Sequence, residues 1–241
     1  MADYDAIGAR YGEAKRAPWR LSLEAYTLER LAGDLRGQRV LDLACGDGFY
    51  TRRMKARGAA RALGVDLSAE MIRLARQAEA AQPLGCEYLV GDAGALIEPG
   101  TFDLVVAAYL LNYAPNRDTL RRMCAVAFTH LRPGGRLIGV NDYTADGAGA
   151  VRDLAAHGLR KLGPGVDVEG APITYEFVLP EGRTFSIVNY YWRPDTYLAA
   201  LREVGFRDPA WHRLALAPDA SPSVFDDFRA AAPCAAFSAR A

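Results

Sequence analysis

A glycine-containing turn and two carboxylates could together hold a nucleoside that carries positive charge. Residues 40–48 read VLDLACGDG, an apolar run that enters a turn containing Gly46 and Gly48. Asp66 ends the next apolar run, where an acid can bind both hydroxyls of a ribose. Asp92 ends a third run, where a carboxylate can accept from the exocyclic amine of adenine. The turn alone could equally be structural, and both acids could simply cap helices.

The elements that must position these residues alternate between strand and helix. Apolar runs at 40–44, 61–66, 86–93, 102–110 and 136–142 predict strands, and helical patterns lie between them, the last of them over 118–130. This alternation predicts an α/β fold, a parallel sheet with helices on both faces. Because parallel strands end at one edge, the turn, Asp66 and Asp92 should meet there.

The remaining segments predict a helical start and an antiparallel end. Residues 2–34 have helical spacing, and residues 174–192 predict a hairpin that turns at 180–182. A helix over 193–206 and a strand near 211–216 follow, so antiparallel strands should finish the sheet. We expect one domain over 1–241, with a helical lid (1–37), a cofactor-binding half (38–145), a substrate-side hairpin with closing strands (146–217) and a tail (218–241). That tail is either loose or folded back as a flap.

Composition excludes several classes of protein. The 241 residues carry 29 Lys+Arg and 29 Asp+Glu, a balance that argues against a nucleic-acid binder. The longest apolar run is far shorter than a membrane span, and the N-terminus shows no signal peptide, so we expect a cytoplasmic protein. The four cysteines form no C-x-x-C pair, and no metal-ligand cluster is visible, so we expect no bound metal.

The motifs VLDLACGDG, LGVDLS, GDA, FDLVVAAYLLNYA and LRPGGRLIGV resemble, in order and spacing, those of class I S-adenosylmethionine-dependent methyltransferases. The resemblance covers roughly residues 38–142, and LREVGF is similar to a later helix and turn of the family. It implies a Rossmann-like, seven-stranded, mostly parallel sheet with an antiparallel end. It also implies S-adenosyl-L-methionine as the cofactor. One departure is Ala44, where the family usually has glycine.

The resemblance also implies which residues contact the cofactor. Asp42, Ala44 and Gly46 would hold its methionine portion and Asp66 its ribose. Asp92 and Ala93 would flank the adenine. The remaining residues of the expected cofactor set are Tyr11, Leu67, Met71, Ala108 and Tyr109.

A nicotinamide dehydrogenase is the rival interpretation of the turn. The turn reads Gly46-x-Gly48-x-x-Thr51, so the third glycine of the dinucleotide fingerprint is missing. Asp42 and Asp47 make it acidic, which suits a sulfonium cation better than a pyrophosphate. A Tyr-x-x-x-Lys pair at 11–15 precedes the turn, whereas dehydrogenases carry theirs after it. These features argue against a dehydrogenase.

Aromatic side chains at strand ends are candidates for holding an acceptor. Aromatic rings can stack on a flat molecule and attract a methylsulfonium, although ordinary core packing is the alternative for each. The expected substrate-binding residues are Tyr4, Trp19, Tyr109, Asn112, Tyr113, Tyr143, Tyr191 and Trp192. Arg10 and Arg20 could pair with the cofactor carboxylate or be solvated charges. The three histidines are expected to be structural, so no general base is evident.

The segments DYDAIGARY, AAYLLNYA and SPSVFDDF are similar to azapteridine N-methyltransferases of the toxoflavin type. This resemblance implies that the leading segment covers the site and that Tyr4 lines it as a catalytic residue. We therefore expect a small, flat, heteroaromatic acceptor, methylated on N or O, and a monomer or homodimer that binds neither nucleic acid nor membrane. A natural-product O-methyltransferase and a non-catalytic S-adenosylmethionine-binding subunit are the alternatives.

Overall fold

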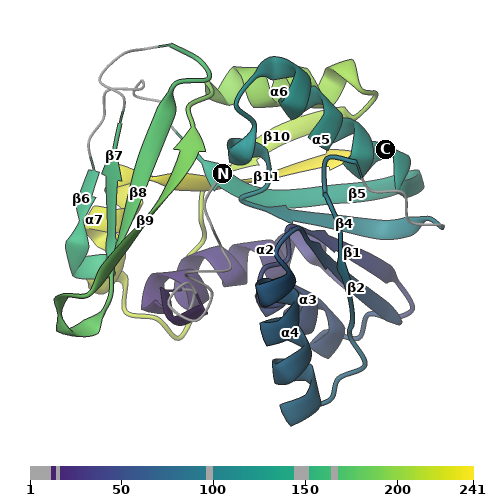
Figure 1. The fold of residues 1–241 in the computed structure, drawn as a ribbon, viewed down its shortest axis with the longest axis horizontal. Helices are drawn as coiled ribbons and strands as arrows, with labels where there is room; N and C mark the ends of the chain where they lie inside the picture. The colour runs from purple at the N-terminus through teal and green to yellow at the C-terminus, as the bar shows by residue number, and fades with distance from the viewer. Residues whose placement is uncertain (1–11, 15–16, 96–99, 144–151, 164–167) are drawn as a thin grey trace.

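The computed structural model describes residues 12–14, 17–95, 100–143, 152–163 and 168–241. They form a large sheet flanked by helices and a smaller sheet beside the carboxyl ends of the central strands (Figure 1). Across these ranges, none of the helices has the length and apolar character that a membrane crossing requires.

The large sheet has seven strands in the order β10-β11-β5-β4-β1-β2-β3. Neighbouring strands from β5 to β3 run parallel, whereas β11 is antiparallel to both β5 and β10. This arrangement confirms the predicted mostly parallel sheet with an antiparallel end. The strands are β1 (Arg39–Leu43), β2 (Arg61–Asp66), β3 (Glu87–Val90), β4 (Phe102–Ala108), β5 (Leu131–Asp142), β10 (Arg207–His212) and β11 (Cys234–Arg240).

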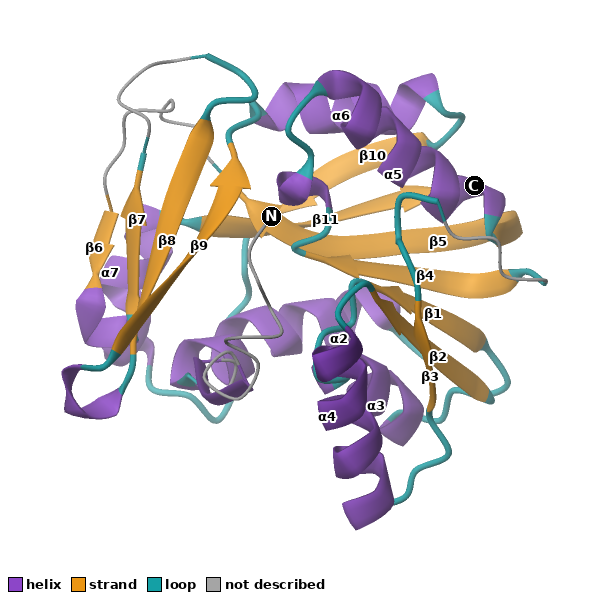
Figure 2. Cartoon of the chain, in the orientation of Figure 1, coloured by secondary structure: helices purple, strands orange, loops and turns teal. Residues whose placement is uncertain are grey.

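Helices cover both faces of the large sheet (Figure 2). The π-helix η1, α2 and α3 pack on one face, and α5 and α6 pack on the other. Side-chain caps fix two starts: Ser68 accepts from the Met71 N–H at 3.1 Å and Asn116 from the Thr119 N–H at 2.9 Å. The helices are η1 (Arg20–Ala25), α2 (Tyr26–Ala32), α3 (Phe49–Ala56), α4 (Ala69–Ala81), α5 (Arg117–Thr129), α6 (Pro194–Glu203) and α7 (Asp226–Ala231).

The smaller sheet is antiparallel, in the order β6-β7-β8-β9. Its strands are β6 (Arg152–Leu154), β7 (Leu159–Leu162), β8 (Pro172–Val178) and β9 (Thr184–Tyr190). The predicted hairpin is confirmed as β8 and β9, joined through the 3₁₀ turn η4 (Pro180–Gly182). The prediction that it extends the main sheet is wrong, because it pairs with β7 instead.

The end of the chain corrects a second prediction. It is neither loose nor a flap, because β11 lies inside the large sheet between β5 and β10. The strand expected at 211–216 is β10 and begins earlier, at Arg207, directly after the turn at Gly205. Both faces of β11 are covered: Ala236 is buried in the core on one face of the sheet, and Ala239 is buried on the other face with α6.

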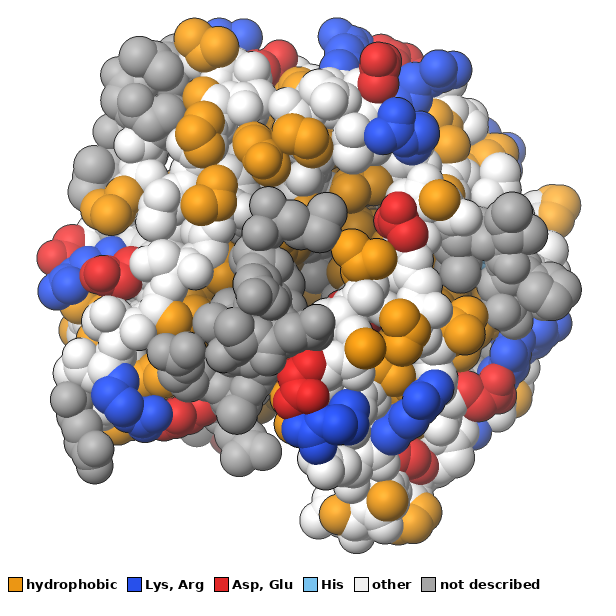
Figure 3. Space-filling model, in the orientation of Figure 1, with side chains coloured by type: hydrophobic (Ala, Val, Ile, Leu, Met, Phe, Trp, Pro, Cys, Tyr) orange, Lys and Arg blue, Asp and Glu red, His pale blue; other side chains and the backbone are white. Residues whose placement is uncertain are grey.

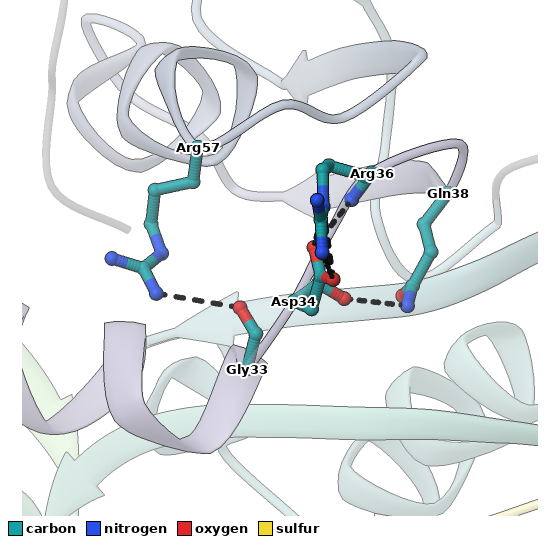
Figure 4. Close-up of polar contacts among 5 residues, drawn as sticks. All are labelled: Gly33, Asp34, Arg36, Gln38 and Arg57. Atoms are coloured by element: carbon teal, nitrogen blue, oxygen red, sulfur yellow. Dashed lines mark hydrogen bonds and ion pairs between the residues drawn. The ribbon is translucent and has the colours of Figure 1, made fainter.

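The connection from α2 to β1 is held by polar contacts at its surface (Figure 4). Arg57 Nη2 donates to the Gly33 carbonyl at 3.3 Å, and Gln38 Nε2 donates to the Asp34 carbonyl at 2.7 Å. The hydrogen bonds from Arg36 lower the pKa of Asp34 to about 2. These contacts lie at the surface of the connection that precedes β1.

Charges of both signs are interspersed on the face seen in Figure 3. Arg160 pairs with Glu176 at 2.9 Å and with Asp153 at 3.3 Å on the smaller sheet, and Arg73 pairs with Glu70 at 2.6 Å on α4. This face therefore carries no strong field of a single sign.

Gly139 provides a test of how β11 is fitted into the sheet. A Cβ on Gly139 would overlap the Ala107 carbonyl and the Phe237 ring of the two neighbouring strands. We expect Gly139→Ala to lower the free energy of unfolding by about 3 kcal/mol in a urea titration. The control is Gly134→Ala in the same strand, where a Cβ meets nothing within 4 Å and φ is +76°. It should lose only about 1 kcal/mol, and equal losses would contradict the packing argument.

Candidate functional site

The candidate residues lie at the carboxyl edge of the parallel strands. One such residue lies at the end of each parallel strand: Ala44 follows β1, Asp66 ends β2, Asp92 follows β3, Tyr109 follows β4 and Asp142 ends β5. The smaller sheet stands beside this edge in Figure 2. The structure thus brings the predicted turn and acids to one side of the large sheet.

The turn after β1 is built from residues in the left-handed region. Ala44, Gly46 and Gly48 have φ values of 57°, 58° and 82°. Asp42 lies beneath the turn, 1% exposed, and accepts from Thr51 Oγ1 at 2.6 Å, which fixes the turn to α3. In this structure Asp42 therefore supports the turn from beneath through its bond to Thr51. The φ of Ala44 also explains why glycine is usual there.

Asp66 connects the turn to the start of α4. Its Oδ2 accepts from the Gly46 N–H at 2.8 Å and its Oδ1 from the Ser68 N–H at 2.9 Å. Leu67 beside it is 51% exposed and offers an apolar surface at the edge. Met71 points the other way and is buried in the core at 1% exposure. Asp66 and Leu67 are therefore placed to meet a ligand, and Met71 is not.

Asp92 and Ala93 occupy the neighbouring turn after β3. Asp92 is exposed, and its Oδ1 accepts from the Gly94 N–H at 2.7 Å. Ala93 is buried at 7% exposure. In this structure Asp92 therefore caps its own turn, a role similar to the helix capping that the sequence left open for it.

Glu24 is fully buried and accepts hydrogen bonds from three side chains. Arg20 Nη1 donates at 3.1 and 3.2 Å, Tyr109 OH at 2.5 Å, and Tyr50 OH also donates to the carboxylate. Arg20 is only 4% exposed, so the interpretation of Arg20 as a solvated charge is wrong. Burial and the Glu24 charge raise the pKa of both tyrosines well above the usual range, so both phenols stay protonated.

A small pocket of about 20 Å³ lies between η1, the end of β4, the inner face of the smaller sheet and the start of β11. Three rings surround the Arg20 guanidinium: Trp19 at 4.6 Å, Tyr109 at 5.3 Å and Phe177 at 5.9 Å. The lining residues are Trp19, Arg20, Tyr109, Leu159, Tyr175, Phe177, Ile187, Asn189, Pro233 and Cys234. The pocket is thus aromatic with a few polar groups, as small-molecule sites usually are.

Among the described residues that were expected at the acceptor, the structure brings only Trp19 and Tyr109 to this pocket. Trp192 is in the core and donates to the Ala114 carbonyl at 2.9 Å, and Tyr143 packs against Trp211 at 5.3 Å. The others that do not line it are Asn112, Tyr113 and Tyr191. Tyr4 and Tyr11 lie outside the described residues, and Ala108 is buried at the end of β4.

Several buried polar residues were not found by sequence reasoning, and two of them, Asn189 and Tyr175, line the pocket. Lys161 and Asp142 form an ion pair of 2.6 Å, each side chain 2% exposed, at the end of β5. Asn189 and Tyr175 come from the smaller sheet. Two features could have indicated Lys161. It occupies an inward position in the alternating pattern of a strand, and it is one of only three lysines in the sequence. The histidines do not line the pocket, and each has a partner elsewhere.

Comparisons with known proteins agree with this geometry. Residues 40–135 match the family model described as a methyltransferase domain. A ubiquinone biosynthesis O-methyltransferase of Ralstonia nicotianae is 36% identical over 105 residues, 43% of this chain and 42% of that protein. A demethylmenaquinone methyltransferase of Lactococcus lactis is 34% identical over 143 residues, 57% of this chain and 53% of that protein. The chain spans about half the length of the curated relatives it matches.

Solved structures extend the likeness to the whole fold. An S-adenosylmethionine-dependent methyltransferase of Mesorhizobium loti superposes with a TM-score of 0.65 at 24% identity, covering 96% of this chain and 99% of that one. The chain therefore has the fold of these S-adenosylmethionine-dependent methyltransferases, and residues 40–135 are the part that matches the methyltransferase domain model.

Ala44 should be strained in its left-handed conformation. That conformation costs an L-residue about 1–2 kcal/mol, and the extra freedom of unfolded glycine offsets about 0.5–1 kcal/mol. We expect Ala44→Gly to raise the free energy of unfolding by about 0.5–1 kcal/mol, measured with urea. Ala62→Gly, at a buried position of β2, should lower it instead. A loss at Ala44 as large as that at Ala62 would disprove the strain.

Glu24 should be essential to the stability of the buried network. Glu24→Gln keeps the shape but leaves the Arg20 charge buried without a counter-charge. We expect it to lower the free energy of unfolding by about 3 kcal/mol in thermal or urea denaturation. The matched control is Glu176→Gln, which breaks a partly exposed ion pair with Arg160 and should cost under about 1 kcal/mol. If both variants lost equally little, Glu24 would not hold the network.

Proposed function

We propose that this chain is an S-adenosyl-L-methionine-dependent methyltransferase that methylates a small, flat acceptor on nitrogen or oxygen. The observation that carries the proposal is the juxtaposition at the strand ends. The left-handed turn after β1 is tied to the Asp66 carboxylate, and Tyr109, which follows the neighbouring strand β4 at the same edge, lines an aromatic pocket. The first suits a cationic nucleoside, and the second suits an acceptor.

The residues present fit the cofactor. Asp47 Oδ1 in the turn is buried and makes no hydrogen bond in the described part of the chain. The ammonium group of the cofactor would donate the hydrogen bond that this oxygen lacks. Gly46 has no side chain, so a ligand can approach its backbone closely. Exposed Leu67 next to Asp66 can cover the face of an adenine. When bound, S-adenosylmethionine supplies an electrophilic methyl group attached to a sulfonium.

The chain's contribution is then to orient the acceptor and exclude water. Trp19, Tyr109 and Phe177 contribute apolar walls to the pocket, which exclude water from it. Correct orientation alone can supply about 7–11 kcal/mol of the barrier. An acceptor atom that already carries an available lone pair, such as a ring nitrogen or a phenolate, needs little help from a base. Direct in-line transfer is therefore the mechanism we propose.

A natural-product or quinone-type O-methyltransferase is the second candidate. The names of two relatives, a ubiquinone biosynthesis O-methyltransferase and a demethylmenaquinone methyltransferase, favour flat hydroxylated or quinonoid acceptors. A non-catalytic S-adenosylmethionine-binding subunit is the candidate from another class, and methyl transfer by the purified chain alone would exclude it. Action in the cytoplasm, as a monomer or homodimer without nucleic acid or membrane, belongs to the same proposal.

Calorimetry with S-adenosylhomocysteine tests the cofactor site. We expect Asp66→Ala to weaken binding by about 1.5–3 kcal/mol, because a charged hydrogen-bond acceptor is lost. Asp34→Ala removes a surface carboxylate in the α2–β1 connection and should leave the affinity unchanged. No binding heat from the unaltered chain would overturn the proposed function, and full affinity in Asp66→Ala would remove Asp66 from the site.

A further inference from the structure

The pocket beside the smaller sheet is closed. Its volume is about 20 Å³, and about 10–15 Å³ of such space is enough for one water molecule. A wall therefore has to move before any larger molecule can enter. One wall belongs to the smaller sheet, which supplies Leu159, Tyr175, Phe177, Ile187 and Asn189.

One end of the smaller sheet is anchored to the large sheet by buried contacts. Lys161 forms its ion pair with Asp142 at the end of β5, and each side chain is 2% exposed. At the same end β9 leads through Trp192, whose indole N–H donates to the Ala114 carbonyl, into α6. Breaking a buried ion pair is costly, so this end stays fixed.

The opposite end of the smaller sheet carries its two turns, η3 (Ala155–His157) and η4, and its polar contacts are exposed. Arg183 pairs with Glu13 at 3.0 Å, and these side chains are 49% and 40% exposed. His157 Nε2 donates to Asp227 Oδ1 of α7 at 2.8 Å, and the Asp227 side chain is 63% exposed. Exposed pairs contribute little to stability, so this end is held more weakly than the other.

The contact made by His157 is connected to the pocket through Trp19. The Trp19 indole N–H donates to the His157 carbonyl at 3.0 Å, and its ring stacks on Phe228 of α7 at 4.5 Å. Trp19 itself lines the pocket. The smaller sheet, α7 and the pocket wall therefore meet at His157, and Figure 2 shows α7 beside β6 and β7.

We infer that the smaller sheet is a gate that opens at its turn end to give access to the pocket, and that the contact between His157 and Asp227 is the clip that holds it shut. The buried pair of Lys161 and Asp142 lies at the end about which the sheet pivots. The inference goes beyond the proposed function, because neither the movement nor its test involves the methyl donor.

Two cysteines can report this movement. Cys234 and Cys124 are both buried, and burial raises the pKa of each thiol to about 12, so neither reacts until an opening brings it to water. Cys234 lines the pocket, whereas Cys124 lies in α5 on the other face of the large sheet. The full chain is treated with N-ethylmaleimide, and peptide mass spectrometry follows each site. We expect Cys234 to react at least about tenfold faster than Cys124, because opening of a part costs less than unfolding of the whole.

Variants connect the opening to the clip. Asp227→Asn keeps the size of the side chain but removes its charge, and should raise the rate at Cys234 about two- to fivefold. His157→Phe keeps a ring beside Phe228 but removes the hydrogen-bond donor, and should have a similar effect. Combining the two substitutions should add nothing further, because both remove the same contact.

The matched control is Asp226→Asn in the same helix. Asp226 pairs with Arg229 within α7 at 3.7 Å, so this substitution should leave the rate at Cys234 unchanged. Amide hydrogen exchange of β11 provides a second control. Gate opening leaves β11 paired with β5 and β10, so its amides should stay protected in Asp227→Asn.

Equal rates at Cys234 and Cys124 in the unaltered chain would overturn the gate, because only unfolding of the whole chain would then expose the pocket. Faster exchange of β11 in step with labelling of Cys234 would also overturn it, since the strand itself would be fraying. An unchanged rate in both clip variants, or an equal rise in Asp226→Asn, would overturn the role of the clip. Each of these outcomes leaves the proposed function to its own test, the binding of S-adenosylhomocysteine.

Discussion

The buried carboxylate of Glu24 is the interaction on which the architecture of the site depends. It accepts from Arg20 in its own helix, from Tyr50 in the helix after the glycine-containing turn, and from Tyr109 at the end of β4. One charge therefore ties the N-terminal helix both to α3 and to the end of β4. Two members of this network, Arg20 and Tyr109, line the pocket together with Trp19, so the network fixes part of the pocket wall.

Much of the fold could be predicted from local pattern, and the failures share a cause. The alternating strands and helices around residues 40–142 carry their own signal, and so does the hairpin of β8 and β9. What the pattern could not give was the sheet to which a strand belongs. β11 reads CAAFSAR, with none of the β-branched residues that mark strands, and it is a strand because β5 and β10 pair with it on both sides.

The same distinction holds for the site. Strand ends predicted the places of Asp66 and Tyr109, because topology alone puts them at one edge. The strand pattern could not distinguish aromatic residues that face the edge from those that lie in the core. Trp192 is one of the latter, and its indole N–H donates to the Ala114 carbonyl. Glu24 and Asn189 are ordinary in sequence. Each becomes informative only through its burial and its partners, or the lack of them.

Features that cost stability are concentrated around the proposed site. Among non-glycine residues in the described part of the chain, four have a left-handed φ, and two of these, Ala44 and Tyr109, follow the central strands β1 and β4. Strained backbone persists where surrounding structure holds it, which is common at ligand sites. Asn189 adds a buried amide without a partner. At Ala44 and Tyr109 the chain therefore keeps a backbone cost at the ends of two neighbouring parallel strands, where the sheet and the turn hold both residues in place.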